Sequence, residues 1–138
     1  MTNNRYVPFL VAGQTIMLPP RRVEGPWRLS YRRNRIVWSD GEHVVIDTAR
    51  GEQMAVDQAI FLGGRDFTNW YHWLVDALPQ LHLANRLPEH LRGLPVVIPE
   101  QIYRYPTMVE ALELFLDGRD VIRVPEWSAV RATRLVWI

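Results

Sequence analysis

Apolar and polar positions follow two different patterns along this chain, and the change between them falls near residue 59. Between residues 35 and 47, short β-prone runs flank Ser39-Asp40-Gly41, which is a favourable turn sequence, and they predict an antiparallel hairpin. Between residues 59 and 124, short apolar runs alternate with segments in which apolar residues recur at helical spacing. This second pattern predicts three strands separated by two helices.

The alternation of strands and helices predicts an α/β fold. The predicted strands cover residues 59–62, 94–99 and 120–124, and the second helix starts near Pro106 and stops at Gly118. Such alternation is typical of a parallel sheet with right-handed crossovers, so we expect a Rossmann-like unit. The apolar positions at helical spacing are Trp70, Trp73, Leu74, Ala77, Leu78, Leu81 and Ala84 in the first helix and Met108, Val109, Leu112, Phe115 and Leu116 in the second. In the first helix we expect Trp70, Trp73, Leu74, Ala77 and Leu81 to face the core.

The two ends of the chain differ in character. Residues 1–34 predict an irregular segment, because four Pro and Gly residues between 19 and 26 interrupt any regular element. Residues 130–138 predict a further strand that stops on apolar side chains and therefore needs a partner and a cover. We expect a Rossmann-like domain over 35–138 that is half of a larger protein. The alternative is a self-contained domain whose last strand is buried.

Composition and charge narrow the classes of function. The chain has 138 residues, the length of one domain, and 48% hydrophobic with 22% charged residues is ordinary for a globular protein. The net charge of +1 gives no general attraction to nucleic acid. No apolar run approaches the roughly 18 residues of a membrane span. We therefore expect no nucleic-acid partner, and a cytoplasmic location or one peripheral to the inner membrane.

Two residue types are missing, and each absence excludes some chemistry. Without cysteine there is no disulfide, no thiolate metal site and no cysteine nucleophile, which fits a reducing compartment. All 16 basic residues are arginine, so a Schiff-base or general-base lysine is excluded. The simpler explanation of this arginine bias is a GC-rich genome, whose codons favour arginine, and it is preferred to a functional one. Any anion must be held by arginine, by backbone amides or by a helix N-terminus.

The densest group of chemically capable residues follows Gly63-Gly64. Asn69, His72 and Asp76 are three and four positions apart, so on a helix they share one face. In an open α/β sheet this turn lies at the carboxyl edge of the strands, where ligands bind. The free amides of the turn and Arg65 would attract an anion. In the alternative interpretation, His72 and Asp76 form only an ion pair across one turn and Asn69 only caps the helix.

Neither a cofactor nor a metal ion is expected at this segment. Gly63-Gly64 has neither the dinucleotide-binding nor the Walker spacing. His72 and Asp76 lack a nearby third His or Cys ligand, so a metal shell would be incomplete.

Pro79 interrupts the helical pattern just after Asp76. Inside a helix, Pro79 removes the hydrogen bond to the Val75 carbonyl and kinks the chain. One interpretation is that this kink directs Asp76 into the ligand crevice. The other is that one helix ends near Leu78 and the next begins with Pro79 at its first position.

The run from Asn69 to Pro79, Asn-Trp-Tyr-His-Trp-Leu-Val-Asp-Ala-Leu-Pro, resembles the signature helix of glycosyltransferase family 61. That family usually shows Asn, two aromatic residues, His-Trp, two apolar residues, Asp, a variable pair and Pro, often followed by Arg. The order of predicted elements over residues 35–138 is also similar to the family. Gln80 stands where the family often has Arg, so any anion contact there is in doubt.

The resemblance implies a fold and an activity. Members of the family are inverting enzymes with two Rossmann domains, the GT-B architecture, and they transfer a sugar from a nucleotide-sugar donor. Bacterial relatives are tied to capsular or other surface polysaccharides, and eukaryotic relatives transfer xylose or N-acetylglucosamine in the secretory pathway. The chain would be the N-terminal half, which mostly holds the glycan acceptor. Alone it is expected to bind acceptor weakly and not to turn over.

The resemblance also implies roles for individual residues. Either Asp76 or His72 is the base that takes the acceptor proton, and the other orients it. Asn69 and Arg65 would hold the acceptor, and Gly64 and Tyr71 belong to the same binding region. The site for the departing diphosphate would lie mostly in the C-terminal half.

A competing class of function is a non-catalytic α/β binding or assembly module. Such a module would form homo-oligomers through the C-terminal strand, residues 130–138.

Overall fold

The chain forms two units, Met1–Thr48 and Ala49–Ile138, and each is described here by itself. In the computed structural model, the described residues are 10–12, 15–17, 36–39, 43–46, 51–62, 67–126 and 128–138.

The first unit contains two antiparallel strand pairs. β1 (Leu10–Ala12) pairs with β2 (Thr15–Met17), which adds two short strands to a segment predicted to be irregular. β3 (Ile36–Ser39) pairs with β4 (Val44–Ile46), with Ser39 opposite Val44. Residues 40–42 lie outside the described residues, so the hairpin stays a prediction. The predicted domain boundary after residue 34 differs from the one between these units, because β3 and β4 group with the first unit.

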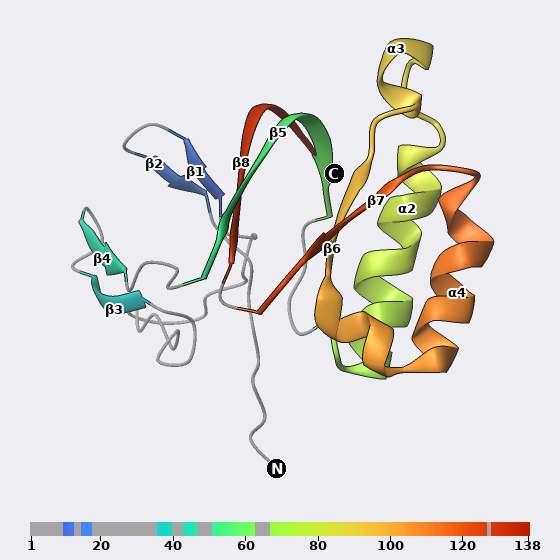
Figure 1. Ribbon diagram of the computed structural model, residues 1–138, viewed down its shortest axis with the longest axis horizontal. Helices are drawn as coiled ribbons and strands as arrows, with labels where there is room; N and C mark the ends of the chain where they lie inside the picture. Colours follow the sequence, from blue (N-terminus) through green and yellow to red (C-terminus); the bar gives the residue numbers. More distant parts are fainter. Residues whose placement is uncertain are drawn as a thin grey trace, which may run out of the picture. The chain divides into compact units, whose positions relative to one another are not determined.

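The second unit is built on a parallel sheet of four strands in the order β7-β6-β5-β8 (Figure 1). All three neighbouring pairs are parallel, which confirms the predicted α/β class and is consistent with a Rossmann-like fold. The predicted strands at 94–99, 120–124 and 130–138 are each present. The four strands are β5 (Gln53–Phe61), β6 (Val96–Pro99), β7 (Val121–Val124) and β8 (Ala129–Trp137).

The strand order reverses at β5. The chain moves outward from β5 to β6 and then to β7, and it returns to place β8 on the other side of β5. This arrangement, third-second-first-fourth, is the one in which ligands bind beyond the carboxyl ends of the two strands at the reversal. Those ends are Phe61 on β5 and Trp137 on β8. They pair directly, and their rings make an edge-to-face contact with centroids 6.1 Å apart.

β5 and β8 are longer than their neighbours, and Figure 1 shows them following a common bend. They pair from Gln53 opposite Ala129 to Phe61 opposite Trp137, whereas β6 pairs only with Ile60 and Phe61. A ribbon held by two strands alone twists more than a wide sheet. Along the chain, only residues 125–128 separate the end of β7 from the start of β8. The run predicted at 59–62 is thus only the buried end of β5.

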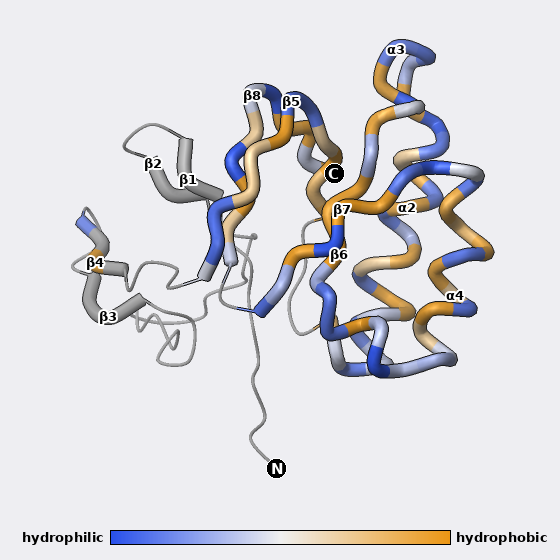
Figure 2. Tube along the Cα trace, in the orientation of Figure 1, coloured by the Kyte–Doolittle hydropathy of each residue, from blue (hydrophilic) through white to orange (hydrophobic). Residues whose placement is uncertain are grey.

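Helices cover one face of this sheet. α2 (Leu78–Ala84) and α4 (Pro106–Leu116) pack against each other, and Figure 2 shows apolar residues recurring along both. α4 begins at Pro106 and ends at two residues with positive φ, Asp117 and Gly118, as the predicted stop required. The shorter elements are α1 (Trp70–His72), the π-helix η1 (Trp73–Ala77), α3 (Glu89–Arg92) and the 3₁₀ helix η2 (Glu100–Arg104).

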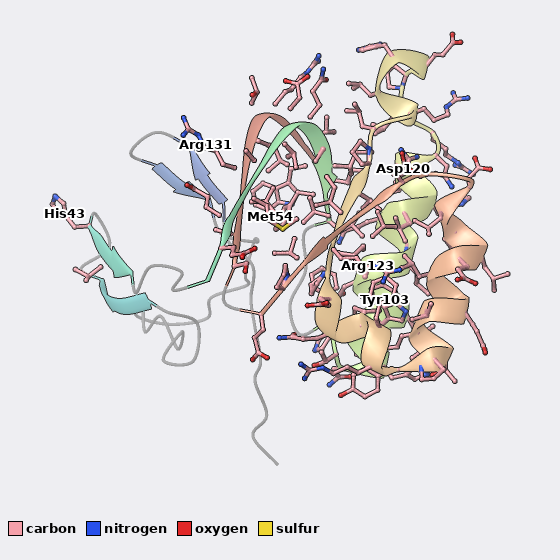
Figure 3. The ribbon with its side chains drawn as sticks, in the orientation of Figure 1. His43, Met54, Tyr103, Asp120, Arg123 and Arg131 are labelled. Atoms are coloured by element: carbon pink, nitrogen blue, oxygen red, sulfur yellow. The ribbon has the colours of Figure 1, made fainter. Side chains whose placement is uncertain are left out.

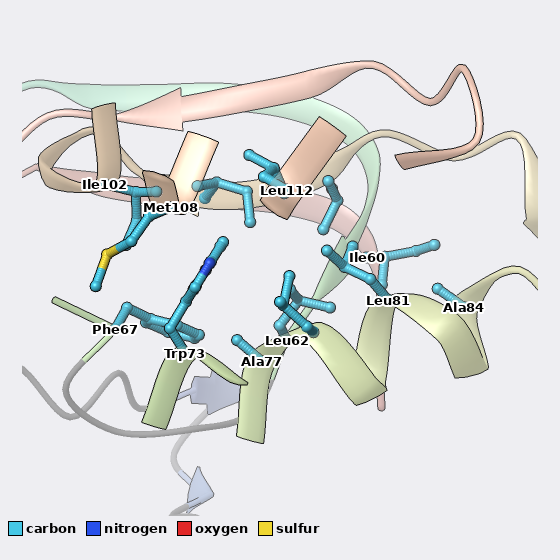
Figure 4. Close-up of a cluster of buried hydrophobic side chains, with 13 residues drawn as sticks. Ile60, Leu62, Phe67, Trp73, Ala77, Leu81, Ala84, Ile102, Met108 and Leu112 are labelled. Atoms are coloured by element: carbon cyan, nitrogen blue, oxygen red, sulfur yellow. The ribbon is translucent and has the colours of Figure 1, made fainter. Parts of the chain in front are cut away.

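The core lies between these helices and the sheet (Figure 4). Along the first helical run, the buried residues are Trp73, Ala77, Leu78, Leu81 and Ala84. The prediction that Trp70 and Leu74 face the core is wrong. Their exposed fractions are 45% and 44%. The face turned to the sheet is narrower than the apolar pattern suggests. The core consists of Ile60, Leu62, Phe67, Trp73, Ala77, Leu78, Leu81, Ala84, Val96, Ile98, Ile102, Met108 and Leu112.

In the part of the chain that the structure describes, no helix combines the length and the apolar character that crossing a membrane requires.

Candidate functional site

The candidate site is built on the helical run that follows β5. Asn69 starts this run with extended backbone angles, φ −89° and ψ 120°. Its Oδ1 accepts a hydrogen bond from the backbone N–H of Tyr71 at 3.0 Å, so Asn69 is an N-cap. The capping bond satisfies an amide that would otherwise lack a partner in the first turn. The side chain of Asn69 is therefore engaged in holding the helix start.

His72 and Asp76 form the chemical centre of the site. Nδ1 of His72 lies 2.7 Å from Oδ2 of Asp76, and the two side chains are 22% and 40% exposed. An ionised carboxylate can only accept, so Nδ1 is the atom that carries the ring proton. The lone pair of the neutral ring is then on Nε2. A carboxylate that fixes one nitrogen in this way leaves the other as a proton acceptor.

Tyr71 contributes a second ring to the site. Its ring meets the His72 ring edge to face, with centroids 5.4 Å apart and an interplanar angle of 78°. Tyr71 is 67% exposed, and Trp70, Leu74 and Val75 on the same helical run are also exposed. The acid–base pair is thus bordered by apolar side chains that the core does not use.

The residues of the predicted site have different outcomes. The structure brings His72 and Asp76 together and sets Tyr71 beside His72. Asn69 caps the same helix, as one of the two interpretations required. Gly64 and Arg65 lie outside the described residues, so their roles stay predictions. Among the residues that are described, no three His, Cys, Asp or Glu side chains gather in a way that could hold a metal ion.

The helical run stands at the carboxyl edge of the sheet. Figure 1 shows its start beside η2, which follows the carboxyl end of β6. Phe67 and Trp73 pack in one buried cluster with Ile102 of η2, and the rings of Phe67 and Trp73 are 6.2 Å apart (Figure 4). Because Trp73 is fully buried, it anchors the turn that carries His72.

Pro79 is accommodated by a wide turn. The residues before it, Trp73 to Ala77, form a π-helix in which the N–H of Leu78 bonds to the carbonyl of Trp73. Pro79 then occupies the first turn of α2. This placement of Pro79 at the start of a new helical element agrees with one of the two interpretations, although Ala77 and Leu78 both keep right-handed helical angles and the backbone stays helical across the junction. A π turn is a known way for a helix to pass an irregular point, and such turns are frequent at functional sites.

Sequence reasoning missed a buried arginine. Arg119 is 8% exposed, and its Nη1 donates to the carbonyls of Arg92 and Leu94, the latter at 2.9 Å. Its Nη2 donates to Oδ1 of Asn85 at 2.8 Å. Burial lowers the pKa of Arg119, and the nearby Asp117 carboxylate opposes that shift. No spacing in the sequence marks this residue, because its partners are mostly backbone carbonyls from a distant segment.

A second arginine was also missed, at the carboxyl edge. The guanidinium of Arg123 on β7 stacks 3.7 Å from the ring centroid of Tyr103 on η2 (Figure 3). Next to it, Arg104 and Glu126 form a long ion pair at 3.8 Å. Both contacts tie η2 to the segment around the end of β7. The position of η2 matters because Ile102 packs in the same cluster as Trp73.

Comparison of the chain with protein-family models, curated proteins and solved structures gave no match.

Proposed function

We propose that this chain is the N-terminal, acceptor-side half of an inverting glycosyltransferase of family 61 type. It would help to move a sugar from a nucleotide-sugar donor to a glycan acceptor in the synthesis of surface polysaccharides. Two lines support the proposal: the resemblance of residues 69–79 to the family's signature helix, and the arrangement of the residues in that helix.

The observation that carries the proposal is the 2.7 Å contact between His72 Nδ1 and Asp76 Oδ2. Inversion requires a base on the acceptor side, and a histidine held by a carboxylate supplies one. Because Asp76 occupies Nδ1, we assign the base to Nε2 of His72 and the orienting role to Asp76.

The reaction would then proceed in one displacement. The acceptor hydroxyl gives its proton to Nε2 of His72 while its oxygen forms a bond to the anomeric carbon of the donor sugar. The bond between that carbon and the diphosphate oxygen breaks, and the nucleoside diphosphate leaves with the electron pair. The developing charge on the diphosphate must be stabilised by cations or amides. By the resemblance, those groups belong mostly to the C-terminal half.

The location of the pair agrees with this role. In sheets with this strand order, ligands bind beyond the carboxyl ends of the strands at the reversal. His72 and Asp76 lie on the first helical run after β5, one of the two strands at the reversal. The exposed Tyr71 ring beside His72 adds an aromatic surface that a sugar ring can contact.

A donor screen on the full-length gene product tests the proposal. Release of nucleoside diphosphate is measured for a panel of nucleotide sugars, with and without glycan acceptors. We expect acceptor-dependent release with one donor, and a loss of about 10²- to 10⁴-fold in kcat in His72→Gln and Asp76→Asn. Asp57→Asn, which changes an exposed carboxylate on β5, is the matched control and should retain the rate. Wild-type turnover in both site variants would reject the assignment.

One observation favours a second function, the assembly module. In the described sheet β8 has β5 as its only neighbour, and Leu135 on β8 is 36% exposed. An edge strand of this kind can pair with a second copy. If assembly is the function, the purified chain should self-associate in sedimentation velocity runs, and Leu135→Asp should abolish that association without unfolding the chain.

A further inference from the structure

The turn that carries Asp76 is wider than an α-helical turn, and the reason lies in the residues that follow. Pro79 has no N–H and its ring would collide with the carbonyl of the residue four positions earlier in a regular α-helix. The π turn at Trp73–Ala77 avoids that collision by bonding Leu78 N–H to the carbonyl five positions back. The helix therefore continues through Pro79 without a break.

The wide turn changes where Asp76 lies relative to His72. In an α-helix four residues advance about 40° beyond one full turn, so their side chains are offset around the axis. A turn that contains more residues removes part of this offset. Asp76 then lies closer to the line above His72, and the two side chains meet at 2.7 Å with both still partly exposed.

Gln80 holds the backbone of the same turn. Its side-chain Nε2 donates to the main-chain carbonyl oxygen of Asp76 at 2.7 Å. Gln80 is partly buried and follows Pro79 directly. Because this bond acts on the backbone of Asp76, it fixes the direction from which the carboxylate reaches His72.

We propose that Pro79 and Gln80 are positioning residues for the His72–Asp76 pair. Pro79 imposes the wide turn that places Asp76 over His72, and Gln80 fixes the Asp76 backbone in that turn. The importance of this positioning for turnover rests on the proposed function, but the geometric claim is independent of it.

The test reads the tautomer of His72, which a merely structural role of Pro79 and Gln80 would not alter. Long-range proton–nitrogen NMR spectra of the ¹⁵N-labelled 138-residue chain, in mildly alkaline buffer, report which ring nitrogen carries the proton. His72→Gln identifies the His72 signals among the four histidines. We expect the wild type to hold the proton on Nδ1, as the contact with Asp76 requires.

Three variants and one control separate the contributions. Pro79→Ala restores an N–H and should let the turn become α-helical, with loss of the Nδ1–H form. Gln80→Met removes the donor and should also lose that form, whereas Gln80→Lys keeps a donor and should restore it. Pro106→Ala changes the proline in the first turn of α4 and should leave the His72 signals unchanged.

Hydrogen exchange at the backbone amide that Pro79→Ala introduces shows whether the turn has in fact closed. The proposal is overturned if that amide is protected while His72 keeps the wild-type tautomer. Should Pro79→Ala not fold, the Gln80 variants decide, and a wild-type tautomer in Gln80→Met overturns the proposal.

Turnover of the full-length product separates this proposal from the proposed function. Where the positioning matters for catalysis, Pro79→Ala and Gln80→Met should lower kcat by up to about a hundredfold with little change in KM. If the wild-type chain shows the Nδ1–H form but Asp76→Asn has normal turnover, the proposed function fails and the positioning stands.

Discussion

Nδ1 of His72 lies 2.7 Å from Oδ2 of Asp76 on the solvent side of a helical turn whose opposite side is anchored by the fully buried Trp73. Packing of Trp73 in the core therefore holds the backbone that carries the pair, while the side chains of His72 and Asp76 stay partly exposed. Ion pairs with this degree of exposure contribute little to folding, because water screens them in the folded state.

The pair should consequently be almost neutral for stability. We expect Asp76→Asn and His72→Gln each to change the free energy of unfolding by less than about 0.5 kcal/mol in urea denaturation. A double-mutant cycle would give a coupling energy of similar size. A loss of several kcal/mol would mean that the pair is a structural element, and the case for a functional site would weaken.

Arg119 should behave in the opposite way. It joins the carbonyls of Arg92 and Leu94 to the side chain of Asn85, and it is nearly buried. Removing it leaves these acceptors without a donor, so we expect Arg119→Met to cost about 2–4 kcal/mol in unfolding free energy. Arg119→Lys should recover only part of this loss, because one ammonium lacks the planar fork of donors.

The control for Arg119 is the side chain of Arg92, which is exposed and makes one long bond, Nε to the Leu87 carbonyl at 3.3 Å. Arg92→Ala keeps the backbone carbonyl that Arg119 uses and should change stability by less than about 0.5 kcal/mol. Equal losses in the Arg119 and Arg92 variants would contradict the assignment of the buried network.

The same network gives a pH dependence with a definite sign. Burial lowers the pKa of Arg119, so between the folded and the unfolded pKa the unfolded chain binds more protons and stability rises with pH. That window lies in the strongly alkaline range, since an arginine guanidinium keeps its proton at ordinary pH. The stability difference between wild type and Arg119→Met should therefore be constant from about pH 6 to 9. Urea denaturation at several pH values in that range measures it, and a slope would point to another group.

Much of the second unit could be predicted because its signals are local. Short apolar runs indicated β6 and β7. Pro106 and Gly118 indicated the ends of α4, because the backbone preference of a single proline or glycine is enough to start or stop a helix. The first part of β5 does carry a period-two pattern, with half-buried Met54 and Val56 between exposed Gln53, Ala55 and Asp57. That local signal is weak because only two large apolar side chains carry it, and the run becomes a strand by pairing with distant β8.

The candidate site was predictable in part for the same reason. His72 and Asp76 are four residues apart, a spacing that puts both on one face of a helix. The exposure of Trp70 and Leu74 was not foreseen, because spacing indicates a helical face and does not say how wide a strip of it the sheet covers. The π turn depends on how Pro79 is accommodated, and the sequence left a kink and a break equally open.

Trp73 offers a test of the core behind the site. It is fully buried, and its indole Nε1 is buried without a hydrogen-bond partner, an arrangement that is costly in itself. Trp73→Phe removes the unpaired N–H together with some contact area, so we expect a loss of only about 1–2 kcal/mol. Trp73→Ala should lose about 3–5 kcal/mol. Thermal and urea denaturation measure both, and similar losses in the two variants would contradict this account.

Gly118 and Gly93 both have room for a Cβ, but their backbone conformations differ. Gly118 has φ +73° and Gly93 has φ −82°, and a Cβ added at either position would meet nothing within 4 Å. With no steric clash at either site, only the backbone conformation should matter. Gly118→Ala should cost about 1–2 kcal/mol, because the left-handed region is unfavourable for a residue with a Cβ. Gly93→Ala should be neutral or stabilise the chain by about 0.4–1 kcal/mol, because it restricts the unfolded state. Urea denaturation of both variants checks this order, and a Gly118→Ala variant as stable as the wild type would show that α4 can end without a left-handed residue at that position.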